Sequence, residues 1–242
     1  MKCCLAVALG FAVAGCSKDC GHKKVQLWKN GPYWAETNIG AEKPWDYGYY
    51  FWWGDTIGYK RVNDAWVASD GSSSDFLFDT ENVPTWDMSE VDLMKEGWVK
   101  TDMFRTAVFL SPEHDAAHVH WGGEWRMPTE MEISDLVKKC DWTWTEIKGV
   151  WGYVVRGKGA YASASIFLPA AGHGDRKSLK SSGWAGDYWS SWVPGRGTFS
   201  TALYFYSDRY DKNDYNGRGK GCPVRPVQSA ANSAGGKGQR QH

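Results

Sequence analysis

Apolar and polar residues alternate in short segments along most of the chain, a pattern typical of β-strands rather than of long helices. In one of these segments Leu203 and Phe205 would face one side of a sheet, and Tyr204 and Tyr206 the other. That strand would have one face for the core and one aromatic face that points outward. Bounded by Gly, Ser or Pro, the predicted strands are 152–156, 165–168, 202–206 and 223–227.

Two segments have helical rather than alternating patterns. Thr129 is a predicted N-cap with Glu132 as its capping-box partner, and the apolar stripe that follows ends near Cys140. Ser89 and Gly97 mark the start and the stop of a shorter predicted helix with a weaker stripe. Short strands with one or two helices predict an α+β fold.

The beginning of the chain has the features of a bacterial lipoprotein leader. Met1-Lys2 precedes an apolar stretch over 5–14, which is too short to span a bilayer, and residues 13–16 match a lipobox. Several acyl chains on one cysteine would hold the protein stably on the outer membrane, at the bacterial cell surface. We therefore predict a signal peptide over 1–15, lipidation of Cys16 and a tether over 16–24. An ordinary cleaved signal peptide with a chance cysteine is the alternative.

A folded domain is expected over 25–227, followed by a tail of small and polar residues over 228–242. The 242-residue chain has 28 basic and 28 acidic side chains, so its formal net charge is zero. A nucleic-acid partner is therefore not expected, because it would require a clustered basic face. Most of the 16 Trp residues must be in the core or face a ligand, since so many exposed indole rings would make a soluble surface adhesive.

The cysteines do not predict a disulfide framework. Two of the six lie in the leader and Cys16 would carry the lipid, which leaves Cys20, Cys140 and Cys222. An odd number cannot pair completely, although one bridge between two of the three stays open. We expect Cys140 and Cys222 to be buried thiols.

An opening segment over 34–55 and six later motifs give the chain a family resemblance. The later motifs lie at 115–117, 121–129, 166–172, 186–191, 202–205 and 224–227. In this order they resemble the formylglycine-generating-enzyme subtype of the C-type lectin fold, as found in secreted bacterial lipoproteins. The most similar members are treponemal variable proteins, whose C-terminal part is rewritten by diversity-generating retroelements. The resemblance implies a C-type lectin-like domain with a variable-type ligand-binding region over about 172–227.

The resemblance also divides this region into framework and contact positions. The implied framework is Tyr188, Trp189, Ser190, Ser191, Leu203, Phe205, Ser207, Arg218, Gly221, Val224, Arg225 and Pro226. The implied ligand-binding residues are Trp184, Asp187, Trp192, Tyr204, Tyr206, Tyr210, Asp211, Asn213, Asp214 and Tyr215. Tyr and Trp supply rigid contact area and Asn and Asp supply adaptable hydrogen bonds, as in antibody paratopes. The implied function is binding of an unknown protein or glycan on another cell or host, without catalysis, cofactor or metal.

Three alternatives stay open. A metal-dependent oxidase-like enzyme of this fold would hold copper with two cysteine thiolates near the C-terminal end, where only Cys222 stands. His114, His118 and His120 could bind a metal from an extended segment, although a structural or surface role is favoured there. In a fixed-specificity glycan-binding protein the aromatic rings would stack on sugars, and in a structural envelope protein they would only pack.

Overall fold

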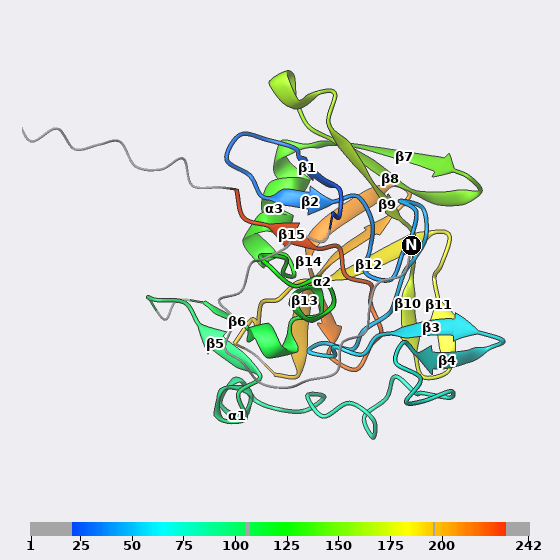
Figure 1. Cartoon of the computed structure of the whole chain (residues 1–242), viewed down its shortest axis with the longest axis vertical. Coiled ribbons are helices and arrows are strands. Elements are labelled where there is room, and N and C mark those ends of the chain that lie inside the picture. Colours follow the sequence, from blue (N-terminus) through cyan, green and yellow to red (C-terminus); the bar gives the residue numbers. More distant parts are fainter. Residues whose placement is uncertain (1–20, 105–106, 196, 231–242) are drawn as a thin grey trace, which may run out of the picture.

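Small antiparallel sheets and short helices make up the protein, which confirms the α+β class. The computed structural model describes residues 21–104, 107–195 and 197–230, and of these it describes 211–215 by their backbone alone. The predicted signal peptide, Cys16, Cys20 and most of the predicted tail lie outside the described residues. Figure 1 shows the sheet β12–β13–β14 in the middle of the molecule, with β7–β8–β9 above it and the hairpins β3–β4 and β5–β6 below.

The described residues form three three-stranded and three two-stranded sheets. The larger sheets are β1 (Lys24–Gln26), β2 (Tyr33–Ala35) and β15 (Val227–Gln228); β7 (Asp141–Ile147), β8 (Val150–Arg156) and β9 (Ser165–Pro169); and β12 (Ala185–Trp189), β13 (Phe199–Tyr206) and β14 (Arg209–Gly217). The smaller sheets are β3 (Tyr59–Val62) with β4 (Ala65–Ala68), β5 (Val99–Thr101) with β6 (Val108–Leu110), and β10 (His173–Asp175) with β11 (Ser178–Lys180).

The two ends of the domain meet in one sheet. Strand β2 pairs with β1 on one side and with β15 on the other. The Nζ of Lys24 donates a hydrogen bond of 2.6 Å to the Oε1 of Gln228, which joins the two outer strands. Regular structure therefore extends one residue beyond the predicted domain at each end, to Lys24 and to Gln228.

Both predicted helices are confirmed. Helix α3 (Glu130–Lys139) begins with a capping box, in which the Thr129 hydroxyl accepts from the backbone N–H of Glu132 and the Glu132 carboxylate accepts from that of Thr129. Helix α1 (Glu90–Lys95) begins after the N-cap Ser89 with the same arrangement. In each case local hydrogen bonds satisfy helical N–H groups, so a short sequence window was sufficient to locate the helix.

Helix α2 (Ala116–Trp121) lies where an extended segment was expected, and that expectation is wrong. It follows the 3₁₀ turn Pro112–His114, and the Asp115 carboxylate caps it by accepting from the N–H groups of Ala117 and His118 at 2.9 and 3.1 Å. Burial raises the pKa of Asp115, which opposes its charge, while these backbone donors lower the pKa. The helix has six residues and no long apolar stripe, which is why its periodicity did not reveal it.

Three of the four predicted strands lie within β8, β9 and β13. The fourth, over 223–227, is wrong apart from Val227. Pro223 and Pro226 have no N–H group to donate, so this segment cannot form a continuous ladder. It bonds instead through scattered carbonyls, including those of Val224 and Pro226, which accept from Ile39 and Ala35 at 3.2 and 2.9 Å.

Buried side chains cluster on both sides of the central sheet. One cluster joins Leu203 and Phe205 of β13 to β8, β9 and the apolar side of α3. Another joins Trp189 to the Phe51–Trp53 segment and to α2. Cys140 and Cys222 are buried, as predicted. No helix in the described ranges is long and apolar enough to cross a bilayer.

Candidate functional site

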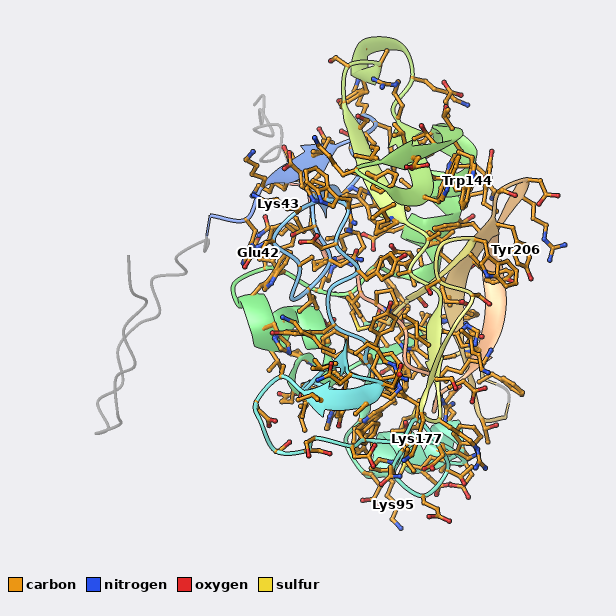
Figure 2. All side chains as sticks on the ribbon, turned by 90° about the vertical axis from the view of Figure 1, so that its right-hand side faces the viewer. Glu42, Lys43, Lys95, Trp144, Lys177 and Tyr206 are labelled. Atoms are coloured by element: carbon orange, nitrogen blue, oxygen red, sulfur yellow. The ribbon has the colours of Figure 1, made fainter. Side chains whose placement is uncertain are left out.

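The predicted alternation along β13 is present. Leu203 and Phe205 are 2% and 0% exposed and belong to the core, whereas Tyr204 and Tyr206 are half-buried on the opposite face of the sheet. On that outer face Tyr206 is paired with Ala185 of β12. The small partner leaves the Tyr206 ring room above the sheet, and Figure 2 shows this ring at the edge of the molecule.

Trp184, Tyr204, Tyr206 and Arg209 form one surface group, which we call the outer aromatic cluster. The rings of Trp184 and Tyr206 stack with centroids 5.8 Å apart and planes 15° apart. The rings of Tyr204 and Tyr206 meet edge to face at 4.6 Å, and the Arg209 guanidinium lies 5.3 Å from the Tyr206 centroid. Trp184 is 57% exposed, so the cluster presents a large ring and a cation to solvent.

Asp187 is implied to be a ligand-binding residue, but its side chain is not exposed. It is 1% exposed and lies on the outer face opposite Tyr204. Its Oδ2 is 3.0 Å from the Nδ1 of His173, and its Oδ1 accepts from the Nδ2 of Asn216 at 3.0 Å. The Nζ of Lys220 in turn donates to the Oδ1 of Asn216 at 2.9 Å. Asp187 therefore ties β10, β12 and β14 together beneath the cluster.

Tyr210 lies on the other face of the sheet from the outer aromatic cluster. It pairs with Phe205, which is on the inner face, because a two-residue turn connects Tyr206 to Arg209. Its ring stacks on Trp142 of β7 at 4.5 Å and meets Tyr153 of β8 at 5.6 Å. Since 37% of it is exposed, Tyr210 is a surface residue that does not join the predicted set of outer tyrosines.

Trp192 lies beyond the end of β12, apart from the outer aromatic cluster. It forms an isolated bridge with Phe109 of β6 and lines a small hollow of about 300 Å³. Met131 at the start of α3 lines the same hollow. Trp192 is therefore placed against hairpin β5–β6 rather than beside Tyr204 and Tyr206.

The remaining predicted contact residues lie on β14. The backbone of this strand runs antiparallel to β13, with Asp211 opposite Tyr204 and Asp214 opposite Ala202. Of these predicted contact residues, the structure describes the backbone but not the side chains of Asp211, Asn213, Asp214 and Tyr215. The pairing places Asp211 next to Tyr204 in the ladder, on the strand that borders the cluster.

Arg225 holds the segment before β15 to the interior of the domain. It is 1% exposed, and its guanidinium donates to the Asn38 Oδ1 and to the carbonyls of Ala35, Glu36 and Phe167 at 2.8 to 3.1 Å. Burial lowers the pKa of Arg225 to about 10, an effect that Tyr188 and Glu36 oppose. A buried cation with four partners fixes those backbone segments in one arrangement.

Arg218 has the same role directly after the end of β14. It is 0% exposed and donates to the carbonyls of Met88, Thr85 and Gly197 at 2.6, 3.2 and 3.3 Å. Its Nε donates to the Ser200 hydroxyl of β13 at 3.2 Å. Burial lowers the pKa of Arg218 to about 10, with Glu90 opposing the shift.

All the implied framework residues except Ser207 are buried.

Two of the three histidines considered for metal binding have side-chain contacts within the fold. His114 stacks on Trp98 at 3.9 Å, and the Nε2 of His120 is 2.9 Å from the carbonyl oxygen of Thr56. Burial lowers the pKa of both His114 and His120. Over the described ranges no group of three or more His, Cys, Asp or Glu side chains is placed to hold a metal ion.

The sequence analysis did not predict the partly exposed aromatic residues of β7 and β8. Trp142, Trp144 and Trp151 continue the ring contacts of Tyr210 and Phe205 outward along hairpin β7–β8, with Trp144 and Trp151 at 6.0 Å. The alternation of Trp and Thr over 141–145 is a strand pattern that could have revealed them.

Comparison of the chain with family models, curated proteins and solved structures found no match. The functional argument therefore depends on the residues themselves.

Proposed function

We propose that the protein is a surface-displayed, ligand-binding lipoprotein with a C-type lectin fold, and that the outer aromatic cluster binds a macromolecular ligand. Six motifs in order along the chain support this fold, as does the burial of nearly all the framework residues that the resemblance implies. The protein acts by binding and not by catalysis. Its partners are a protein or glycan on another cell or host, and the membrane that carries its anchor.

One observation carries this proposal. Neighbouring aromatic residues on β13 divide between the interior and the surface: Phe205 is 0% exposed, while Tyr206 is half-buried and stacks on the 57% exposed Trp184. Large exposed rings with few rotatable bonds are the residues that dominate binding at protein interfaces. If Trp184 only stabilised the fold, it would not need to be exposed at the surface.

The base of the cluster gives it a fixed geometry. Asp187 bonds to His173 and Asn216, and Arg218 bonds β13 to three carbonyls outside the sheet. Because the contact strands are already ordered, little conformational entropy is lost when a ligand binds. The side chains above this base can then change without a change of fold, which is the basis for diversification by a retroelement.

Binding of the fluorescent, tetramerised protein to intact bacterial and animal cells tests the role of the cluster. We expect the double variant Trp184→Ala/Tyr206→Ala to lose at least about 10-fold in cell binding, because two central rings are removed. Trp151→Ala is the matched control, since Trp151 is a similarly exposed ring at 42% on another sheet. Equal loss in the control, or full binding by the double variant, contradicts the proposal.

The proposed anchor has a separate test. A fatty acid with a chemical handle, supplied to cells that express the full chain, should label the wild-type protein and leave Cys16→Ser unlabelled. Labelling of the serine variant contradicts the lipidation of Cys16.

Diversification is tested in the gene. A nearby near-copy of the codons for about 172–227 is expected, which differs mainly at adenines and is accompanied by a reverse transcriptase. Without these features the protein is a fixed-specificity binder.

A further inference from the structure

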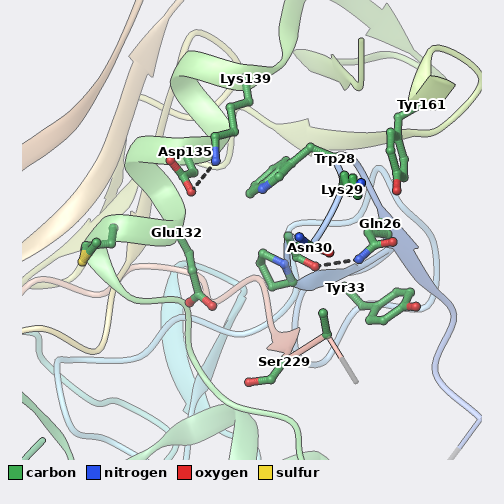
Figure 3. Close-up of a pocket in the computed structure, with 14 residues that line it drawn as sticks. Gln26, Trp28, Lys29, Asn30, Tyr33, Glu132, Asp135, Lys139, Tyr161 and Ser229 are labelled. Atoms are coloured by element: carbon green, nitrogen blue, oxygen red, sulfur yellow. Dashed lines mark hydrogen bonds and ion pairs between the residues drawn. The ribbon is translucent and has the colours of Figure 1, made fainter. Parts of the chain in front are cut away.

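A second hollow, of about 970 Å³, shares no lining residue with the outer aromatic cluster. Its walls are the β1–β2 hairpin, the exposed side of α3, the turn at Tyr161 and residues 229–230 (Figure 3). No lining residue belongs to β12, β13 or β14. The hollow is therefore a site distinct from the proposed binding surface.

The hairpin wall has a fixed backbone. Asn30 has a φ of 60°, the left-handed conformation in which Asn is one of the few tolerated side chains. Gly31 approaches the Trp28 ring so closely that a Cβ there would lie 2.4 Å from it. The Nε2 of Gln26 closes the loop by donating to the Gly31 carbonyl at 2.8 Å. The loop is thus held in one shape before any ligand binds.

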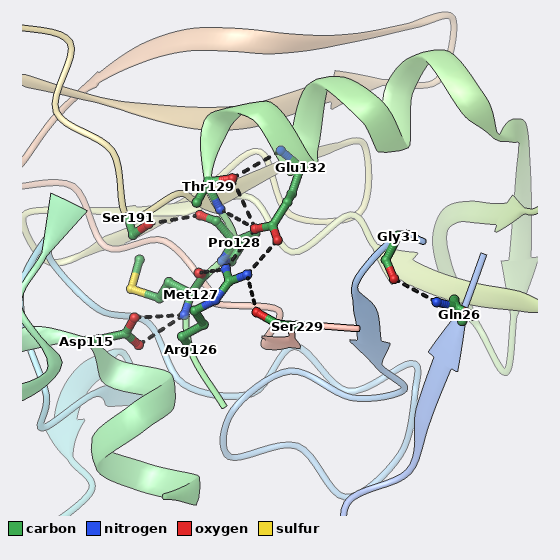
Figure 4. A network of polar contacts seen from close by, with 10 residues as sticks. All are labelled: Gln26, Gly31, Asp115, Arg126, Met127, Pro128, Thr129, Glu132, Ser191 and Ser229. Atoms are coloured by element: carbon green, nitrogen blue, oxygen red, sulfur yellow. Dashed lines mark hydrogen bonds and ion pairs between the residues drawn. The ribbon is translucent and has the colours of Figure 1, made fainter. Parts of the chain in front are cut away.

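The helical wall is fixed by two ion pairs, one at Glu132 (Figure 4) and one at Asp135 (Figure 3). The two terminal nitrogens of Arg126 donate to the Glu132 carboxylate at 2.8 and 2.6 Å, and one of them also reaches the Ser229 hydroxyl at 3.3 Å. Burial raises the pKa of Glu132, but the bonds and charge of Arg126 outweigh this and lower it overall. One turn further on, Lys139 donates to Asp135 at 2.9 Å.

The lining combines rings, amides and balanced charges. Three aromatic side chains, Trp28, Tyr33 and Tyr161, surround the hollow, and Figure 3 shows the two tyrosines on one side of it. Two amides, two carboxylates and two ammonium groups complete the polar lining, supplied by Gln26, Asn30, Glu132, Asp135, Lys29 and Lys139. The two carboxylates and two ammonium groups of the lining cancel. Arg126, which is paired with Glu132 behind the lining, leaves the wall with a single excess positive charge.

We propose that this hollow binds a neutral oligosaccharide. Sugar hydroxyls both donate and accept, which matches amide, carboxylate and ammonium groups on facing walls, and the C–H faces of a sugar ring pack on aromatic rings. The volume is near the upper end of the range of about 300–1,000 Å³ for small-ligand sites, which allows for more than one sugar ring. A nucleotide or an acidic glycan carries several negative charges and would require a larger excess of positive charge than the one that Arg126 leaves at this wall.

Two side chains of the lining are suited to substitution. Tyr161 is half-buried in a 3₁₀ turn at the mouth of the hollow, where it would stack on a sugar. Asn30→Gly deletes only an amide and keeps a residue suited to positive φ. Asn63→Gly is its matched control, because Asn63 is exposed, has a φ of 45° and lies outside the hollow in the β3–β4 turn.

Isothermal titration of the full chain, purified in a detergent without sugar, tests the proposal. The probes are tetrasaccharides of β-1,4-glucose, β-1,4-N-acetylglucosamine, α-1,4-glucose and α-1,6-mannose, with a heparin tetrasaccharide and triglycine for comparison. We expect at least one neutral probe to bind with a Kd of about 1 mM or tighter. Tyr161→Ala and Asn30→Gly should each weaken this binding at least about 5-fold with an unchanged Tm, and Asn63→Gly should not weaken it.

The other outcomes overturn the proposal. They are no neutral probe binding with a Kd of about 1 mM or tighter, binding that either hollow variant retains, or tighter binding of the heparin tetrasaccharide or of triglycine. Trp184→Ala/Tyr206→Ala should leave the tetrasaccharide affinity unchanged. A loss in that variant would place the sugar at the outer aromatic cluster, so failure here is separable from failure of the proposed function.

Discussion

The two faces of β13 carry similar residues with opposite surroundings. Phe205 meets Tyr153 at 5.3 Å and Tyr188 at 6.0 Å inside the core, whereas the next residue, Tyr206, meets Trp184 and Arg209 at the surface. An aromatic ring can therefore either stabilise this fold or be available for contact, depending on one step along the strand. The difference teaches that residue type alone does not tell which rings are available for contact, and that burial does.

The arginines of the same region repeat this division. Arg225 and Arg218 are buried and bond to backbone carbonyls, while Arg209 lies over a tyrosine ring at the surface. Removal of a buried cation leaves several carbonyls without a donor, and removal of an exposed one leaves none. Replacement of a buried arginine should therefore lower the free energy of unfolding by several kcal/mol more than replacement of the exposed Arg209.

Arg225→Ala should have the largest effect. It removes the donor for the Asn38 side chain and for the carbonyls of Ala35, Glu36 and Phe167, in a place that water does not reach. We expect a loss of at least about 5 kcal/mol in the free energy of unfolding, or failure to fold. Arg209→Ala is the control and should change it by less than about 1 kcal/mol. Urea unfolding followed by tryptophan fluorescence measures both, and comparable losses would remove the distinction between the two kinds of arginine.

The comparison of buried and exposed charged groups also predicts a pH dependence of stability. Asp55 is the buried group here, with a carboxylate that is 2% exposed. Burial raises its pKa from 3.8 to about 7, against the opposing bonds from the N–H groups of Ile57 and Gly58. The folded state then binds the proton more tightly than the unfolded state, so this group's contribution to stability falls as pH rises from about 4 to 7. The wild type should lose about 4 kcal/mol more than Asp55→Asn over that range.

Urea unfolding at several pH values measures this difference. The exposed Asp64 provides the control, since Asp64→Asn should leave the pH dependence of the wild type unchanged. Parallel curves for the wild type and Asp55→Asn would show that the interior carboxylate titrates as it does in the unfolded chain.

Phe205→Ala should have the next largest effect. The substitution opens a cavity among Tyr153, Tyr188 and Trp142, and such losses cost at least about 3 kcal/mol. For a domain of this size that corresponds to a fall in Tm of roughly 6–12 °C. Differential scanning calorimetry measures it, and a change below about 2 °C would indicate that the inner face is not a close-packed core.

The sequence predicted the features that short-range chemistry decides. The capping boxes at Thr129 and Ser89 locate α3 and α1, and the period of two along β13 gives the inner and outer faces correctly. Helix α2 was not predicted because its apolar stripe is short, although Asp115 could have been recognised as its N-cap.

Long-range contacts decide the rest. The burial of Asp187 depends on His173 and Asn216, which lie 14 and 29 residues away in the chain. The place of Tyr210 depends on the two-residue turn before Arg209, which sets the register of the hairpin. The hollow beside α3 joins segments from both ends of the domain, and no local pattern could have indicated it.

Tyr206→Ala should have the smallest effect on stability, although it removes a ring as large as that of Phe205. Its contacts are the stacked Trp184, the edge-to-face Tyr204 and the exposed Arg209, and surface ring pairs of this kind contribute about 0.5–1.5 kcal/mol. The fall in Tm should therefore be no more than about 4 °C in the calorimeter, well short of the fall for Phe205→Ala. Equal falls for the two adjacent substitutions would mean that both faces of β13 stabilise the fold. The outer tyrosine would then not be replaceable, and a surface open to diversification would have to lie elsewhere on the domain.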